Sequence, residues 1–181
     1  MVGLALFVLA SPCQTGLHSV CVRLVHRMPV WVKDEFINAW KQEWKPSMLL
    51  GLILGVLWSV LAYGAYMVVA VDGGMSVGYL LMMLLAAYFL TGITLFGYQQ
   101  IAMLELPFGT QLKNAALLIF AGKLRAFFAI VVWVGMLLVP AIYYGLAAYI
   151  LLAGWVAIGV MTANVIFAPV FSRLFLTGEP E

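Results

Sequence analysis

Long runs of apolar residues alternate with short polar segments along all 181 residues of the chain. A helix that crosses the hydrocarbon core of a bilayer needs about 20 mostly apolar residues. Three runs are each long enough for one such helix. A fourth uncharged run, residues 126–171, is long enough for two helices with a turn near residues 145–154. The pattern therefore predicts five transmembrane helices, at about residues 2–22, 48–71, 77–99, 126–146 and 151–171.

The composition supports a bilayer as the solvent of this chain. Hydrophobic residues make up 66% of it and charged residues 9%, whereas soluble chains carry about 25% charge. In lipid the backbone must satisfy its own hydrogen bonds, and the run "MLLGLILGVLWSVLA" lacks the alternation of a transmembrane β-barrel. We therefore predict an all-α, polytopic helical membrane bundle. It forms a single domain over residues 1–176, followed by a short cytoplasmic tail at residues 177–181.

The basic residues fall on one side of this predicted layout. Nine Lys and Arg residues are present, and none lies in the connection between spans two and three or between spans four and five. They are Arg23, Arg27, Lys33, Lys41 and Lys45 before the second span, Lys113, Lys123 and Arg125 before the fourth, and Arg173 after the fifth. Because basic residues favour the cytoplasmic side, we expect a multi-pass protein with its C-terminus in the cytoplasm.

One segment, "VWVKDEFINAWKQEWKPS", is rich in both charge and tryptophan. On a helix, Phe36, Ile37, Trp40 and Trp44 form one apolar stripe, with most polar residues elsewhere. Such a helix lies in the membrane interface. We predict an interfacial helix at about residues 31–45 that ends at Pro46. It serves either as an anchor for the second span or as a cytoplasmic docking helix. The candidate docking residues are Phe36, Ile37, Trp40, Lys41 and Trp44.

A second amphipathic segment follows the third predicted span. Thr110 is a plausible N-cap after a Pro and Gly turn. The uncharged stretch after Lys113 is too short to cross a membrane. The pattern predicts a second interfacial helix at about residues 110–122, or a shallow re-entrant turn.

Polar and small residues within the predicted spans suggest two further features, a ligand path and a helix-packing stripe. Gln14 and His18 are four residues apart and share a helix face. They form a candidate ligand path with Tyr143 and Tyr144; the alternative is hydrogen bonding between helices of the bundle. The small residues Gly51, Gly55 and Ser59 form a stripe on the second span. Such a stripe allows close helix packing, within the chain first and between two copies second.

Several classes of function are not supported by the residues. No Asp, Glu, Lys or Arg lies near the centre of a predicted span, which argues against a self-sufficient ion-coupled transporter. The chain lacks a catalytic constellation and a phosphate-binding glycine loop, and His18 and His26 have no further metal ligands at a suitable spacing. The net charge of +2 is too small to indicate nucleic acid as a partner. We therefore expect no enzyme activity, no cofactor and no metal.

Three stretches in order, "LFVLASPCQTG", "EFINAWKQEWKPS" and "QLKNAALLIFAGKLRAFF", resemble the YesL-like family of bacterial integral membrane proteins. That family is defined as a domain of unknown function, so it supplies no catalytic residues. The resemblance implies a helical protein of the bacterial plasma membrane whose genes often lie beside ABC-type carbohydrate importers. Family members have more residues ahead of the Ser-Pro motif, which here begins at Ser11. If such a segment precedes this chain, the count becomes six spans.

These observations lead to one leading hypothesis and two alternatives. The leading one is a non-enzymatic accessory subunit that contacts the permease and ATPase subunits of an ABC-type carbohydrate importer. The first alternative is an independent small-solute transporter or channel. The second is a structural homo-oligomer that packs through Gly51, Gly55 and Ser59.

Overall fold

The computed structural model is helical throughout most of the residues that it describes, which are 2–72, 76–104, 106–143 and 148–173. Side chains are described for a smaller set: residues 8–68, 70, 76–104, 106–135 and 156–173. The helices in these ranges are α1 Val2–Val25, α2 Val32–Gln42, α3 Trp44–Asp72, α4 Val77–Met103, α5 Phe108–Ala121, α6 Lys123–Tyr143 and α7 Ala148–Phe171.

Two of these helices are long and apolar enough to cross a membrane, Trp44–Val68 within α3 and the whole of α4. A third candidate is the pair formed by α5 and Lys123–Gly135, which is bent by 105°. The predicted all-α fold is thus confirmed, and the described residues hold two to three candidate spans where five were predicted. The count rests on the described side chains, which end at Gly135 in α6 and begin at Val156 in α7, and α1 is not among the candidates in the part of the chain that is described.

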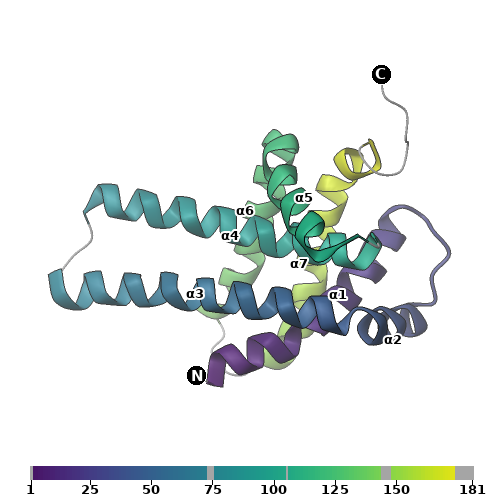
Figure 1. The fold of residues 1–181 in the computed structure, drawn as a ribbon, viewed down its shortest axis with the longest axis horizontal. Coiled ribbons are helices and arrows are strands. Elements are labelled where there is room, and N and C mark those ends of the chain that lie inside the picture. Colours follow the sequence, from purple (N-terminus) through teal and green to yellow (C-terminus); the bar gives the residue numbers. More distant parts are fainter. Residues whose placement is uncertain (1, 73–75, 105, 144–147, 174–181) are drawn as a thin grey trace.

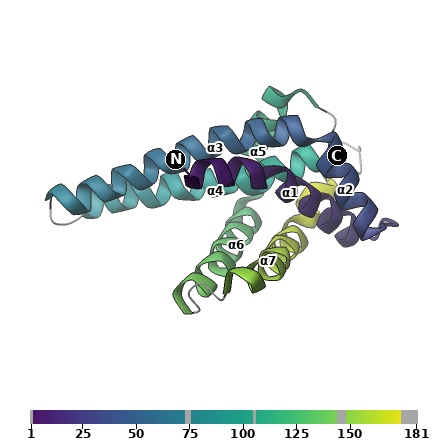
Figure 2. The same ribbon diagram turned by 90° about the horizontal axis from the view of Figure 1, so that it is seen from below.

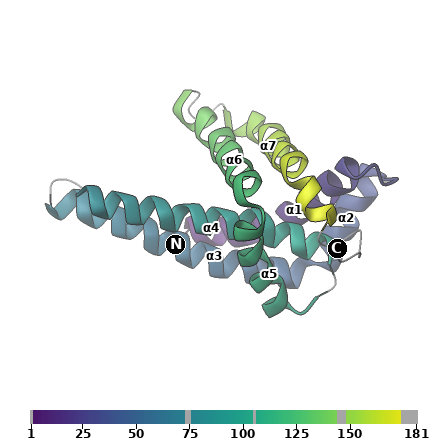
Figure 3. The ribbon, with the colours of Figure 1, turned by 90° about the horizontal axis from the view of Figure 1, so that it is seen from above.

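The helices form two hairpins that cross (Figure 1). One consists of α3 and α4, which lie side by side and project to the left in Figure 1. The other consists of α6 and α7, which run steeply across the first pair, as Figures 2 and 3 show from below and above. Helix α1 packs against α3 and also contacts α4 and α7. Helix α2 lies at the end of the molecule opposite the free end of the α3–α4 hairpin.

The core is divided between these hairpins. The larger cluster joins α1, α4, α5, α6 and α7 and includes Phe96 and Phe167, whose ring centroids lie 4.3 Å apart. The smaller cluster joins α3 to α4 through Leu50, Leu54 and Tyr98. Helix α4 contributes to both clusters, which is why most of its second half is buried. The free half of the α3–α4 hairpin instead exposes apolar side chains, as expected for a surface that faces lipid.

Helices α1 and α3 cross at Gly51. A Cβ atom built on Gly51 would lie 1.8 Å from Ser11 Oγ and 2.7 Å from Ser11 Cβ. The absence of a side chain is therefore what allows α1 to approach α3 so closely. Gly55 is also buried, whereas Ser59 is exposed and donates a hydrogen bond to the Gly55 carbonyl at 2.7 Å. At Gly51, the predicted small-residue stripe serves packing within the chain.

The structure differs from the prediction at the end of the charged segment. We expected one helix that stops at Pro46, but α2 ends at Gln42, Glu43 follows, and α3 begins at Trp44. Pro46 lies in the first turn of α3, where its missing N–H group costs no helical hydrogen bond. Proline thus helps to begin the following helix instead of ending the preceding one.

The second amphipathic segment forms α5, close to the predicted range. At its end, Gly122 separates it from α6, and Lys123 has a φ of 44°. A residue with a side chain rarely adopts this left-handed conformation. The bend of 105° is located at this junction, which agrees with the predicted alternative of a re-entrant turn.

Candidate functional site

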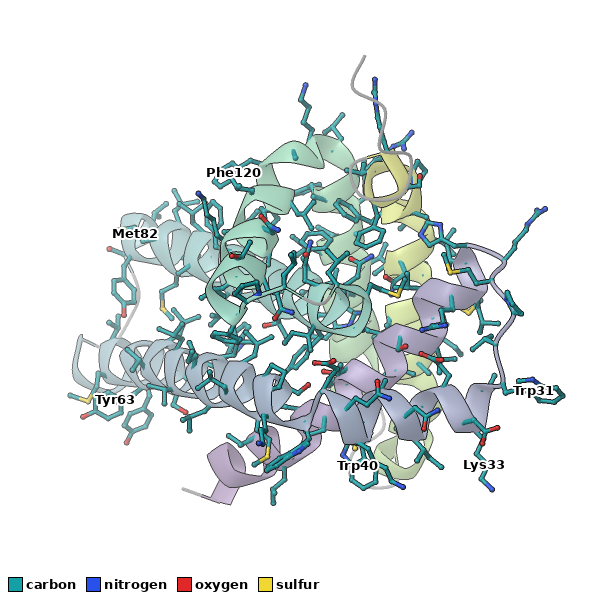
Figure 4. All side chains as sticks on the ribbon, turned by 45° about the vertical axis from the view of Figure 1, so that its right-hand side comes forward. Trp31, Lys33, Trp40, Tyr63, Met82 and Phe120 are labelled. Carbon is teal, nitrogen blue, oxygen red and sulfur yellow. The ribbon has the colours of Figure 1, made fainter. Side chains whose placement is uncertain are left out.

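Helix α2 presents two different faces to its surroundings. Phe36 is half-buried and packs near Gly16 of α1, where a Cβ atom would lie 3.0 Å from Phe36 Cδ2. Ala39, one turn further, is buried. Three tryptophans in or beside α2 are exposed: Trp31, just before α2, by 83%, Trp40 by 44% and Trp44, the first residue of α3, by 47%. Figure 4 shows Trp31 and Lys33 pointing outward, away from the other helices.

Trp40 and Trp44 border an apolar groove between α1, α2 and α3. Its volume is about 460 Å³, and its lining consists of Leu9, Pro12, Trp40, Lys41, Trp44 and Met48. Lys45 Nζ lies 5.7 Å from the ring centroid of Trp44, within cation–π range. Of the predicted docking residues, Trp40, Lys41 and Trp44 therefore lie on one open surface. Phe36 instead contacts α1, and Ile37 is half-buried.

The inward side of α2 holds polar residues that the sequence analysis did not single out. Glu35 accepts a short hydrogen bond from Ser19 Oγ of α1. Its Oε1 atom also lies 2.9 Å from Arg23 Nε, without the alignment of a hydrogen bond, so this contact is an ion pair. The three residues tie α2 to the last two turns of α1.

A polar cavity of about 330 Å³ lies beside this ion pair. Its polar walls come from α1 and α2, and the last turn of α4 closes it. The lining residues are Ser19, Arg23, Glu35, Asn38, Ala39, Gln42, Glu43, Ile101, Ala102, Met103 and Leu104. The sequence does indicate a polar face on α2, because Glu35, Asn38 and Gln42 recur at spacings of three and four on one side of this helix. The partner helices were not evident from sequence.

Further polar side chains are buried between α1, α3 and α4. Tyr98 donates a hydrogen bond to Ser11 Oγ at 2.9 Å. The hydroxyl groups of Thr15 and Ser47 are hydrogen-bonded at 2.6 Å. These bonds join all three helices, which is the packing role that polar groups commonly have inside membrane bundles.

Two buried side chains near these bonds retain polar atoms without a described partner. The imidazole of His18 stacks on Tyr98 with a centroid distance of 6.3 Å, and its Nδ1 atom has no hydrogen-bond partner among the described residues. The same holds for both side-chain polar atoms of Gln100, which is fully buried. Unpaired polar atoms in an apolar interior are costly, so these two side chains stand out from the hydrogen-bonded polar groups around them.

The predicted ligand path is only partly described. Gln14 is half-buried and His18 is fully buried, one turn further along α1. Tyr144 and the side chain of Tyr143 lie outside the described residues. Among the residues that are described, no group of three or more His, Cys, Asp or Glu side chains is placed to hold a metal ion.

Comparisons with known proteins give one match. Residues 1–65 match the model of a family described as "Protein of unknown function, DUF624". The match covers α1, α2 and most of α3, and thus both helices that supply the polar walls of the cavity. It is consistent with the resemblance to YesL-like proteins. No curated protein and no solved structure matches the chain.

Proposed function

We propose that this chain is a non-enzymatic accessory subunit of the bacterial plasma membrane that docks onto an ABC-type carbohydrate importer through α2. The observation that supports this role is the open surface of Trp40, Lys41 and Trp44. In the proposed layout α1, α3, α4, α6 and α7 are five spans. Helices α2 and α5 lie at the cytoplasmic interface, and the C-terminus is cytoplasmic. This layout requires the α6–α7 hairpin to align with α3 and α4 in a bilayer.

Aromatic residues at both ends of α3 support a membrane-spanning role for this helix. Trp44 begins α3, and Tyr63 and Tyr66 lie exposed toward its other end. At 1.5 Å per residue, Trp44 and Tyr63 are about 28 Å apart along the axis, close to the thickness of the hydrocarbon core. Tryptophan and tyrosine prefer the two membrane interfaces, so these residues fit opposite headgroup regions.

The proposed orientation predicts which positions face the same side. Single cysteines at Lys41 and Lys113, in a background without Cys13 and Cys21, are expected to react only with a reagent that reaches the cytoplasm. A cysteine at Ser76, between α3 and α4, is expected to react from outside. The measurement is labelling of intact cells with membrane-impermeant and permeant maleimides. Labelling of positions 41 and 113 from opposite sides would contradict the layout.

The exposed tryptophans have two physical uses, lipid anchoring and protein docking. Tryptophan rings favour the headgroup region in either case. A groove beside them gives a partner helix or loop a concave apolar surface, with Lys41 at its edge. We therefore favour protein docking over lipid anchoring as the role of these tryptophans. The proposal that the partner is an ABC-type importer rests on the resemblance of this chain to YesL-like proteins.

The docking proposal predicts the loss of partners when both rings are replaced by acids. The double variant Trp40→Asp, Trp44→Asp is expected to reduce the co-purified permease and ATPase subunits by more than about tenfold, because carboxylates in the wall of the groove would have to lose their water when an apolar partner segment docks. The variant Trp40→Phe, Trp44→Phe keeps the apolar surface and is expected to retain most of them. Quantitative mass spectrometry of tagged protein from native membranes measures both.

Two controls make this result interpretable. Thermal unfolding in detergent must be equal for the variants and the wild type, which shows that α2 still packs on α1. Membrane insertion must also be unchanged. If the acidic double variant folds and keeps every partner, α2 is not the docking helix.

An independent small-solute transporter is the second candidate. The observation in its favour is the buried group of His18, Tyr98 and Gln100, in which His18 Nδ1 and the amide of Gln100 have no hydrogen-bond partner among the described residues. Purified chain in liposomes that moves labelled solute without any other subunit would support this candidate and count against an accessory role.

A further inference from the structure

We infer that the polar cavity between α1, α2 and α4 is a binding site for a neutral ligand with adjacent hydroxyl groups, of about the size of a monosaccharide. The inference rests on the size of the cavity, on its balance of charge and on the hydrogen-bonding groups in its walls. It depends neither on the docking role of the exposed tryptophans nor on the family resemblance.

The cavity has the size of a site for one small molecule. Its volume of about 330 Å³ falls at the lower end of the range for pockets that hold small molecules. It lies where α2 meets the ends of α1 and α4, at the end of the molecule opposite the free end of the α3–α4 hairpin (Figure 1). This volume suits a single sugar ring or a short polyol better than an extended chain.

The charges in the lining favour neither a cation nor an anion. Arg23 Nε and Glu35 Oε1 lie 2.9 Å apart, so opposite charges stand side by side. A cation would be attracted by Glu35 and repelled by Arg23, and the reverse holds for an anion, so the two effects largely cancel. Glu43 also lines the cavity but has an interaction partner of its own, so we assign it no part in selecting the ligand. A neutral ligand also avoids the cost of taking a charge out of water.

The ion pair leaves a donor and an acceptor for a ligand. The contact with Arg23 and the hydrogen bond from Ser19 both go to Glu35 Oε1, so Glu35 Oε2 takes part in neither. The ion pair uses Nε of Arg23, and the two terminal nitrogens of the guanidinium carry its remaining N–H donors. The pair can therefore accept a hydrogen bond from one hydroxyl group and donate to the next.

Two side-chain amides of α2 repeat this combination of donor and acceptor. Asn38 and Gln42 lie four residues apart on one face of α2, and both line the cavity. Each amide holds an acceptor oxygen beside a donor NH₂ group. Neither amide is hydrogen-bonded within the part of the chain that the structure describes. Each can therefore pair with two adjacent hydroxyl groups, donating to one and accepting from the other.

Hydroxyl groups are the ligand groups that match such walls. A hydroxyl group donates one hydrogen bond and accepts others, as water does. A ligand with several hydroxyl groups can thus displace water from the cavity and reproduce its hydrogen bonds. An ammonium group only donates and a carboxylate only accepts, so either would leave half of each donor–acceptor pair without a partner. Ala39 and Ile101, both buried, add a small apolar surface for the C–H groups of the ligand.

The test measures binding to the full chain in nanodiscs of phosphatidylcholine, whose headgroup has no hydroxyl group. Glucose and myo-inositol are the free probes, and ligand-observed NMR titration gives their affinities. Tetrahydropyran-2-methanol, which keeps the ring of glucose but only one hydroxyl group, is the neutral control. Methylammonium and acetate are the charged controls.

A second arm tests whether the hydroxyl groups belong to a lipid headgroup. The nanodiscs then also contain glucosyl diacylglycerol, and native mass spectrometry reports whether this lipid stays bound in preference to phosphatidylcholine. The first arm detects a free polyol and the second a lipid headgroup.

Two variants remove the amides, and a third makes the same change elsewhere. Asn38→Ala and Gln42→Ala are each expected to weaken binding about fivefold, the usual effect of losing hydrogen bonds between uncharged groups. Both side chains are exposed, so the fold is expected to persist, which thermal unfolding in detergent checks. Asn114→Ala on α5 removes an amide outside the lining and should leave binding unchanged.

Each outcome decides the proposal. Binding of glucose or myo-inositol, or retention of the glucosyl lipid, supports it if Asn38→Ala and Gln42→Ala weaken the binding and Asn114→Ala does not. If one of the two α2 variants does not fold, the other carries the comparison. The proposal is overturned if neither the free polyols nor the glucosyl lipid binds, if the single-hydroxyl control or a charged control binds equally well, or if the α2 variants weaken binding no more than Asn114→Ala.

Discussion

Replacing Gly51 with alanine is expected to destabilise the chain by about 3 kcal/mol, because overpacking at a tight contact typically costs 1–3 kcal/mol and here also displaces a hydrogen-bonded group. The new Cβ atom would lie 1.8 Å from Ser11 Oγ. Ser11 has little freedom to move, since Tyr98 donates a hydrogen bond to it at 2.9 Å. Helix α1 would have to move away from α3. Unfolding of the purified chain in mixed micelles with increasing SDS measures the loss.

Two further variants test whether this effect comes from the helix crossing. Gly78→Ala is a matched control, because Gly78 lies in α4 with no atom within 4 Å of a built Cβ. It is expected to be neutral or slightly stabilising, since alanine favours helix over glycine. Adding Ser11→Gly to Gly51→Ala removes the opposing side chain, and recovery of at least part of the loss is expected. Equal losses for Gly51→Ala and Gly78→Ala would show that the crossing is not tight.

Replacing Phe167 with alanine is the second change for which a large effect is expected, a loss of about 3 kcal/mol. Phe167 is fully buried and contacts Phe96 of α4. It also covers Gly122, where a Cβ atom would lie 2.5 Å from Phe167 Cε2. One ring thus connects α7 to α4 and to the bend between α5 and α6. Because Phe167 is fully buried, its removal is expected to leave a cavity that lipid does not reach.

The matched control for this prediction is Phe128→Ala on α6. Phe128 is 54% exposed, and lipid can occupy the space that its ring leaves. A loss below about 1 kcal/mol is therefore expected there. Phe167→Leu, which keeps part of the volume, should fall between the two. The same SDS titration measures all three, and a loss at Phe167 no larger than that at Phe128 would mean that α7 does not pack as described.

Local sequence patterns were sufficient to predict where the helices of this chain lie. Apolar runs of the length of a bilayer predicted α3 and α4 close to their observed bounds, and periodicity predicted α2 and α5 as separate amphipathic helices. These properties depend on neighbours a few residues apart, which the chain order gives directly. One local signal was misread: Pro46 indicated the end of a helix but lies in the first turn of α3.

The candidate sites were predicted less completely, because they depend on residues far apart in the chain. The sequence indicated the outward surface of α2, since its tryptophans recur at helical spacing. It did not indicate the inward side, where Glu35 meets Arg23, or the pairing of Ser11 with Tyr98 across 87 positions. His18 was singled out, but its neighbour Tyr98 was not.

The sequence by itself thus determined that the chain is helical and apolar enough for a membrane, and where its basic residues gather. Only the tertiary structure decided which side of α2 faces the protein, that Gly51 is used within the chain, and that the α6–α7 hairpin crosses α3 and α4. The physical reason is that hydrophobicity and helix periodicity are properties of a segment. Close packing and cavities depend on how the helices are arranged against one another, and several arrangements would bury the same apolar residues about equally well.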